Sequence, residues 1–257
     1  MIDSIAYSSK FRYKSPCLKA FFAVSALILC VIDRSVILSL LVLVLMGALI
    51  AYSSRVSLHF FMHLISVPVI FVLISTIAIM VNISEYPLSS FAIPVSDKFI
   101  TISEKGFYEG IKLMLTALSA VSCLYFLSFT TPMIDILIVL RTIRCPALII
   151  ELIMLIYRFI FILLNIAQSI SISQKSRLGN KSFTISLKSA AALSSVLLIR
   201  ALSYSRSLYD SMESRCYDGV ICVLQESRKA KVHEIIVVVL IDALFIGICL
   251  VEWWWKV

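Results

Sequence analysis

Six long apolar runs constrain this chain more than any other feature of its sequence. A helix needs about 20 apolar residues to cross the hydrocarbon core of a bilayer, and about 17 is near the lower limit. The charged fraction is 15%, well below the roughly 25% of a soluble domain. The sequence therefore predicts an all-α, polytopic membrane protein. The runs cover residues 20–32, 35–51, 64–83, 108–129, 146–167 and 235–251.

The run 146–167 differs from the others because it contains Glu151 and Arg158. A charge at the centre of a bilayer costs at least about 2.5 kcal/mol on insertion scales. If this run crossed the membrane, the basic segment after it would lie outside, against the tendency of Lys and Arg to stay in the cytoplasm. We therefore predict that 146–167 does not cross. The basic residues of that segment are Lys175, Arg177, Lys181, Lys188, Arg200, Arg206, Arg215, Arg228, Lys229 and Lys231.

The remaining runs predict about five spans and a large cytoplasmic region. The chain starts inside, because its first residues are basic, and ends outside with tryptophans at the outer interface, where tryptophan is enriched. The predicted parts are an N-terminal bundle of about four spans over 1–130, a cytoplasm-facing region over 131–234, and a last span with the C-terminus over 235–257. The basic residues are Lys10, Arg12, Lys14 and Lys19, and the tryptophans are Trp253, Trp254 and Trp255.

Two long amphipathic helices are predicted in the cytoplasmic region, over 146–178 and about 186–216. Each carries an apolar stripe at helical spacing, ends in an arginine and is followed by Gly179 or Gly219. The stripes are Leu163, Ile166, Ile170, Gln174 and Arg177 in the first helix, and Leu197, Ala201, Tyr204, Leu208, Met212 and Arg215 in the second.

Two explanations fit these arginine-tipped stripes. Each arginine can simply stabilise the C-terminal dipole of its helix. Alternatively, the planar guanidinium can bind a carboxylate of a partner while the apolar stripe lies in the partner's groove. The second explanation accounts for the arginine following the stripe in both helices.

Composition narrows the class of protein further. The net charge of +8 fits basic loops beside anionic lipid, and no basic patch is interleaved with aromatics as nucleic-acid binding would need. The seven cysteines form no CxxC pair, so neither a disulfide nor a metal framework is expected. We also find no HExxH, GxSxG or phosphate-binding GxxxxGK[ST] motif. The sequence thus predicts a non-catalytic membrane protein.

Two smaller groups of residues are further candidates. His59 and His63 stand four residues apart, which suits a metal pair, but no third ligand is near, so interfacial histidines are the better interpretation. Asp242 lies inside the last span, where an acidic residue is a functional candidate. A hydrogen-bonded acid, or a polar pair with Arg158 in the bundle, is the simpler interpretation.

The segment "RSLYDSMESRCYDG" (206–219) resembles the signature of the transmembrane T component of energy-coupling-factor transporters, which import vitamins and metals in bacteria and archaea. That family carries two Ala-Arg-Gly motifs at the ends of its coupling helices. The matching triplets here are Ser176-Arg177-Leu178 and Ser214-Arg215-Cys216. The ending "CYDG" is more similar to the cobalt/nickel type than to the vitamin type. Further similar motifs, in the family's order, are "SPCLK", "FTTPMIDIL", "LRTIRCP" and "YRFIFIL".

The two triplets depart from the family pattern at their last positions. Leu178 and Cys216 replace the glycines, so we expect the helix ends to turn differently, with Gly179 able to replace the first glycine one position later. The resemblance carries the docking role to the six triplet residues, and the coupling-helix stripe to Ile170, Gln174, Leu208 and Met212.

The resemblance implies an ATP-driven importer in the cytoplasmic membrane. Two ATP-binding-cassette ATPase subunits would each receive one coupling helix, and their motion would tilt a separate substrate-binding membrane subunit. ATP would be bound by the partners, so no cofactor is expected in this chain. Cobalt or nickel is the expected cargo, with a vitamin as the alternative. An independent channel or secondary transporter is the alternative of another class, but it needs a polar path through the membrane, and Asp242 alone supplies little of one.

Overall fold

The computed structural model describes residues 2–53, 58–84, 92–95, 98–102, 104–219 and 231–256. It divides into two compact units, one formed by residues 1–139 with 227–257 and the other by residues 140–226. The first unit holds the helices that coincide with the five predicted spans. The second holds the two predicted amphipathic helices.

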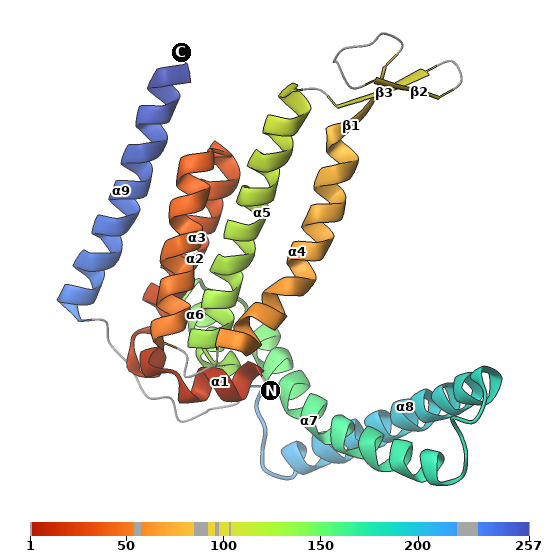
Figure 1. Cartoon of the computed structure of the whole chain (residues 1–257). Helices are drawn as coiled ribbons and strands as arrows, with labels where there is room; N and C mark the ends of the chain where they lie inside the picture. The colour runs from red at the N-terminus through yellow and green to blue at the C-terminus, as the bar shows by residue number, and fades with distance from the viewer. Residues whose placement is uncertain are drawn as a thin grey trace. The chain divides into compact units, whose positions relative to one another are not determined.

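The first unit is a bundle of long helices (Figure 1). Each predicted span falls on one of them, because every one of these apolar runs is uninterrupted by charge over most of its length. α5 is central, since it packs against α2, α3 and α4, while α9 packs on α2. The helices are α1 (Ile2–Ser8), the 3₁₀ turn η1 (Lys10–Tyr13), α2 (Pro16–Asp33), α3 (Val36–Ser53), α4 (Leu58–Met80), α5 (Glu104–Thr130), α6 (Met133–Thr142, which reaches into the second unit) and α9 (Val232–Lys256).

The core of this bundle comes from residues repeated every three or four positions on each helix. The rings of Phe22 on α2 and Phe126 on α5 meet edge to face with centroids 5.9 Å apart, and Phe245 of α9 joins the same cluster. The other fully packed members are Ala23, Ala26, Leu38, Val42, Met46, Ile50, Cys123 and Phe129.

One buried lysine ties the start of α2 to the end of α5. Lys19 is 6% exposed, and its Nζ donates to the backbone carbonyl of Thr130 at 2.7 Å and to that of Phe11 at 3.2 Å. A lysine is almost never buried without such partners. The lysine of the "SPCLK" motif therefore holds the bundle together at this end.

A small antiparallel sheet lies between α4 and α5 in the sequence, and the sequence analysis did not predict it. Its strands are β1 (Val81–Ser84), β2 (Ala92–Val95) and β3 (Lys98–Ile102), in the order β1-β3-β2. Val81 pairs with Ile102, and Ala92 pairs with Thr101. The strands are only four or five residues long, too short for a clear alternating pattern.

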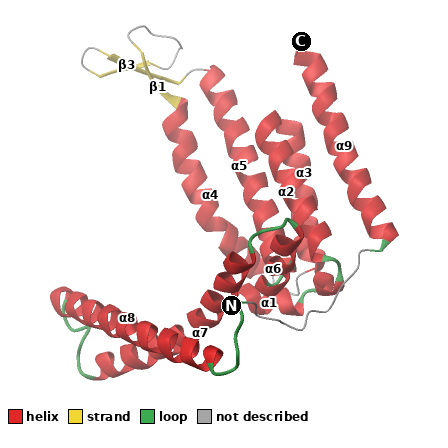
Figure 2. Ribbon diagram, turned by 180° about the vertical axis from the view of Figure 1, so that it is seen from behind, coloured by secondary structure: helices red, strands yellow, loops and turns green. Residues whose placement is uncertain are grey.

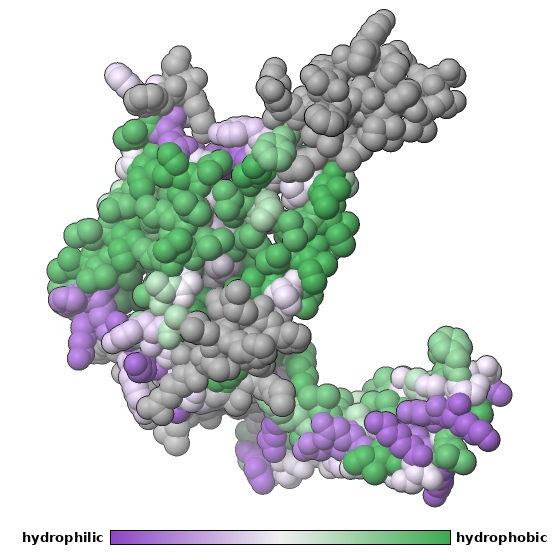
Figure 3. Space-filling view, in the orientation of Figure 1, coloured by the Kyte–Doolittle hydropathy of each residue, from purple (hydrophilic) through white to green (hydrophobic). Residues whose placement is uncertain are grey.

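The second unit consists mainly of two long helices, α7 (Ala147–Ser176) and α8 (Phe183–Glu213). Figure 2 shows them joined by a short loop. No described residue of α8 is buried, and α7 buries only Ile150 and Glu151. In Figure 3 the surface of this pair mixes hydrophilic and hydrophobic side chains, whereas the bundle of the first unit presents a broad hydrophobic surface.

Length and composition allow six helices among the described residues to cross a membrane: α2, α3, α5, α7, α8 and α9. α4 contributes a shorter apolar stretch, Leu64–Ile79. The predicted fold class is confirmed: the chain is a predominantly helical, multi-pass membrane protein. α7 and α8 are as long and apolar as α2, α3, α5 and α9 by this measure, so length and composition do not show whether they cross the membrane. The five-span topology, its orientation and the three-part division of the chain stay predictions.

Candidate functional site: the ends of α7 and α8

The end of α7 forms a Schellman motif around Arg177. The backbone N–H of Leu178 donates to the carbonyl of Lys175 at 3.1 Å, and that of Gly179 donates to the carbonyl of Gln174 at 2.8 Å. These two bonds satisfy carbonyls that the helix would otherwise leave without partners. Arg177 is the capping residue, so the predicted arginine stands at the last position of the helix.

The end of α8 repeats this pattern around Arg215. The N–H of Cys216 donates to the carbonyl of Glu213 at 3.0 Å, and the N–H of Tyr217 donates to the carbonyl of Met212 at 3.1 Å. The two arginine triplets therefore share one backbone geometry as well as a similar sequence. Both arginines are exposed.

The last residue of each triplet adopts the left-handed conformation that favours glycine. Leu178 has φ of 61° and Cys216 has φ of 56°, which costs a residue with a side chain about 1–2 kcal/mol. The expectation that these ends turn differently from glycine-containing ones was wrong, because the hydrogen bonds of the motif fix the conformation whatever the residue. The expectation that Gly179 replaces the glycine was also wrong, since Leu178 itself takes the positive φ.

Gly179 is needed for a different reason, the close approach of α8. A Cβ atom at this position would lie 2.8 Å from the carbonyl oxygen of Gln174 and 2.9 Å from Oγ of Ser189. Ser189 Oγ donates to the carbonyl of Gly179 at 2.9 Å, and Gln174 Nε2 donates to the carbonyl of Ser189 at 2.9 Å. The end of α7 is thus held against the first turns of α8.

A hydrogen bond between side chains links the end of α8 to the beginning of α7. The hydroxyl of Tyr217 donates to Oε2 of Glu151 at 2.7 Å, and Glu151 is 6% exposed. This bond is the main cause that raises the pKa of Tyr217 above its usual value. Glu151, whose charge argued against a membrane span, therefore has a structural partner 66 residues later in the chain.

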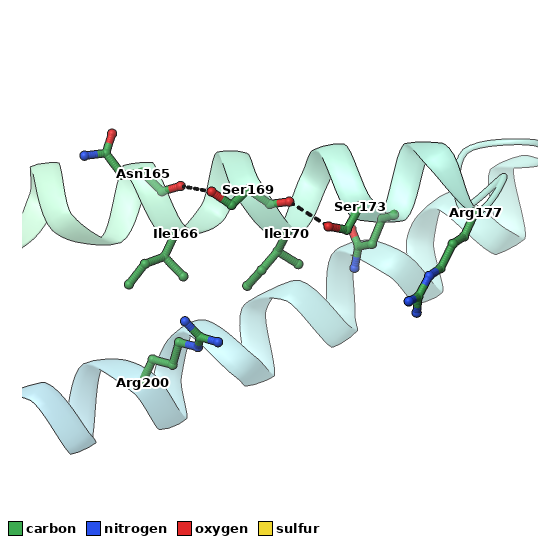
Figure 4. A pocket seen from close by; sticks show the side chains of 8 residues that line it. Asn165, Ile166, Ser169, Ile170, Ser173, Arg177 and Arg200 are labelled. Carbon is green, nitrogen blue, oxygen red and sulfur yellow. Dashed lines mark hydrogen bonds between the residues drawn. The ribbon is translucent and has the colours of Figure 1, made fainter.

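The first stripe lines a pocket of about 530 Å³ beside these contacts. Ile166, Ile170, Gln174 and Arg177 of the stripe all border it, together with Arg200 of α8. Figure 4 shows Arg177 pointing from α7 toward α8 and Arg200 pointing from α8 toward α7. Four of the five stripe residues therefore border one pocket, and their role as a coupling-helix stripe stays a prediction. In the second stripe, Leu208 and Met212 are half-buried.

The remaining candidates lie apart from this site. Asp242 of α9 accepts from Ser25 Oγ of α2 at 3.0 and 3.1 Å, so it is a hydrogen-bonded acid that links two helices of the bundle. Arg158 is an exposed residue of the second unit, and its pairing with Asp242 stays a prediction. The side chains of His59 and His63 lie outside the described residues.

Sequence reasoning missed three residues of this site. Ser189 and Tyr217 act through contacts with residues distant in sequence, which no local pattern reveals. Arg200 had a weak signal: it lies on α8 three residues after Leu197, the first residue of the second stripe, and therefore near the face that carries this stripe. The sequence analysis placed it only among the basic residues of the region.

Comparison with known proteins identifies the family of this chain. The family model described as the cobalt transport protein CbiQ matches residues 8–226. The chain is 31% identical over 248 residues to an uncharacterised protein of Methanocaldococcus jannaschii, covering 96% of this chain and 91% of that protein. It is 27% identical over 219 residues to the cobalt transport protein CbiQ of Salmonella typhimurium, covering 85% and 97%.

A third relative is a putative fused cobalt transport protein, CbiMQ, of Methanocorpusculum labreanum. The identity is 31% over 255 residues, which cover 98% of this chain and 42% of the fused protein. The fused protein therefore carries a large additional part beside the region that matches this chain.

These matches identify the class of protein, a non-catalytic membrane subunit of a transport system. The chain belongs to the CbiQ family of cobalt transport proteins, the T components of cobalt-type energy-coupling-factor transporters. The resemblance inferred from the sequence is thereby confirmed, and the cobalt type is supported over the vitamin type. The chain is the energy-coupling transmembrane subunit of a cobalt importer.

Proposed function

We propose that the ATPase subunits transmit their ATP-driven motion to this subunit through the ends of α7 and α8. Arg177 and Arg215 each dock in a groove of one cytoplasmic ATPase subunit and bind a carboxylate there. The observation that carries the proposal is the repeated helix end: two exposed arginines in the same Schellman geometry. Two equivalent contacts suit two equivalent partners.

The neighbouring residues contribute shape to these contacts. Ser176 and Ser214 are small residues before each arginine, and Leu178 and Cys216 follow at the turn. Leu178 is 67% exposed, which leaves an apolar side chain available to a partner's groove. The stripe residues would give each helix the stiffness and the apolar contact needed to transmit the motion of the ATPase. These residues are Ile170, Gln174, Leu208 and Met212.

The second proposed partner is a substrate-binding membrane subunit that faces the bundle of the first unit. The fused relative supports this association, because its name, CbiMQ, places CbiM and CbiQ in one chain. We further propose that the N-terminus and the helix pair face the cytoplasm and that the C-terminus lies outside, in the cytoplasmic membrane of a bacterium or archaeon. The positive-inside bias supports this orientation.

The experiment is a charge reversal at both helix ends. In the double variant Arg177→Glu/Arg215→Glu, we expect cobalt uptake and co-purification of the ATPase subunits to be lost, because each docking carboxylate would meet a like charge. The matched control is Arg206→Glu, an exposed arginine of α8. Membrane insertion of both variants is measured alongside. Normal recruitment of the ATPases by an inserted double variant would show that docking lies elsewhere.

A further inference from the structure

The pocket between α7 and α8 contains a second arginine that the docking proposal does not use. Arg177 and Arg200 both border it, and neither guanidinium group has a hydrogen bond or ion pair with any residue in the described part of the chain. Figure 4 shows the two side chains reaching into the space between the helices from opposite sides. Two positive groups that face one pocket favour a negatively charged occupant.

The remaining polar groups of the pocket also favour a hydrogen-bond acceptor. Ser169 Oγ donates to the carbonyl of Asn165 at 3.0 Å, and Ser173 Oγ donates to the carbonyl of Ser169 at 3.1 Å. These hydroxyl protons are therefore already used within α7. The free donors are mainly the two guanidinium groups, and no carboxylate of the described residues lines the pocket. An acidic group suits it better than a neutral or cationic one.

The positions of the two arginines indicate an elongated occupant. Gln174 of α7 bonds to Ser189 of α8, which fixes the register between the helices. Arg177 lies three residues beyond that contact, toward the loop between the helices, and Arg200 lies eleven residues beyond it in the other direction. At 1.5 Å per residue these offsets are about 4.5 Å and about 16 Å. A single phosphate group is too small to engage both.

The lining between the two arginines also has an apolar part. Ile166 and Ile170 form that part. The complementary surface is thus a stretch of polypeptide with acidic side chains at its two ends and an apolar side chain between them. This composition is typical of a protein segment that docks on a helix pair.

We propose that this pocket receives an acidic segment of the ATPase subunit that docks at the end of α7, with Arg200 as its second charged contact. The inference rests on the proposed function, since it assigns more of the partner's surface to the same helix end. The ATPase subunit would then hold the end of α7 through two charged residues, Arg177 and Arg200, and we call this a two-point contact. A helix that its partner holds at two points follows both the rotation and the translation of that partner.

The test compares Arg200→Glu with Arg206→Glu, which reverses a charge on the same helix at a residue that does not line the pocket. The full chain in nanodiscs is titrated with its cognate ATPase subunits at low and high salt. Arg200→Glu is expected to weaken binding about tenfold or more and to reduce its salt dependence. Arg206→Glu is expected to have little effect. Arg177→Glu/Arg200→Glu is expected to be less damaging than the two single effects combined, because both residues serve one segment.

The outcomes separate the two proposals. If Arg177→Glu weakens binding while Arg200→Glu behaves like Arg206→Glu, the docking function stands and the two-point contact is wrong. If Arg177→Glu and Arg215→Glu also leave binding unchanged, the docking function itself is wrong. The titration is repeated in nanodiscs of phosphatidylcholine alone and with phosphatidylglycerol. An Arg200→Glu effect seen only with the anionic lipid would identify a lipid headgroup as the occupant and overturn the inference.

Discussion

The end of α7 and the end of α8 have the same backbone but are held in place differently. Both are Schellman motifs with an arginine at the tip and a residue with a side chain at positive φ. The end of α7 is fixed by two hydrogen bonds to α8 and by close packing, in which Gly179 lies against Ser189. The end of α8 is linked to α7 by a hydrogen bond from Tyr217 to the buried Glu151.

The difference shows how one docking geometry is positioned twice in the same unit. Each helix end rests on the other helix: the end of α7 on the start of α8, and the end of α8 on the start of α7. The two arginines are therefore set by a closed pair of contacts rather than by a buried core, of which α8 has none. Close packing is sensitive to side-chain volume, whereas a hydrogen bond is sensitive to polarity and pH.

The largest expected effect is at the packed end. Gly179→Val places a side chain where even a Cβ atom would lie under 3 Å from two oxygens, so overpacking should cost about 3 kcal/mol. Thermal unfolding of the purified protein in detergent measures the loss. The counterpart is Gly219→Ala beyond α8, where an added Cβ meets nothing within 4 Å, and only the strain of its positive φ remains. Equal destabilisation by both changes would remove the distinction between the two ends.

A smaller effect is expected at the hydrogen-bonded end. Tyr217→Phe removes one hydrogen bond from the buried Glu151 and should destabilise the helix pair. Tyr209→Phe is the matched control, because Tyr209 is an exposed tyrosine of α8. Protease sensitivity of the region after α8 is a direct measurement. Identical digestion of the two variants would contradict the anchoring role of Tyr217.

The same bond makes the end of α8 sensitive to alkaline pH. The pKa of Tyr217 is raised by its bond to Glu151, so the bond stabilises the folded pair fully below the ordinary tyrosine pKa of about 10. That stability is lost as pH rises through the raised pKa, because the phenolate no longer donates. Protease sensitivity after α8 should increase there in the unmodified chain and change little in Tyr217→Phe. A pH-independent digestion pattern would contradict this.

The smallest effects are expected at the residue with positive φ that both helix ends share, Leu178 in one and Cys216 in the other. Leu178→Gly and Cys216→Gly should each stabilise the protein by about 1 kcal/mol, because glycine adopts positive φ without a Cβ clash. Leu178→Ala keeps the clash and serves as the control. Thermal unfolding is again the measurement. Destabilisation by either glycine would mean that the side chain at the turn contributes more packing than the strain costs.

Much of the fold could be predicted from the sequence because it follows from local pattern. The first amphipathic helix was expected over 146–178 and lies at Ala147–Ser176, and the second was expected over about 186–216 and lies at Phe183–Glu213. Apolar periodicity, Pro146 before the first helix and the glycines after both helices define these limits.

The contacts that position the site could not be predicted, because they join distant residues. Tyr217 and Glu151 are separated by 66 positions, and Lys19 and Thr130 by 111. The conformation at Leu178 and Cys216 was mispredicted for a physical reason. Residue preference disfavoured a left-handed turn there, but the two hydrogen bonds of each motif outweigh that preference.

The most direct test of two equivalent docking ends is the number of ATPase subunits that each variant retains. Native mass spectrometry of the assembled transporter counts them for the unmodified chain, for Arg177→Glu and for Arg215→Glu. We predict two ATPase subunits on the unmodified chain and the loss of one from each single variant. Two subunits retained by both single variants would contradict the claim that each arginine holds one ATPase.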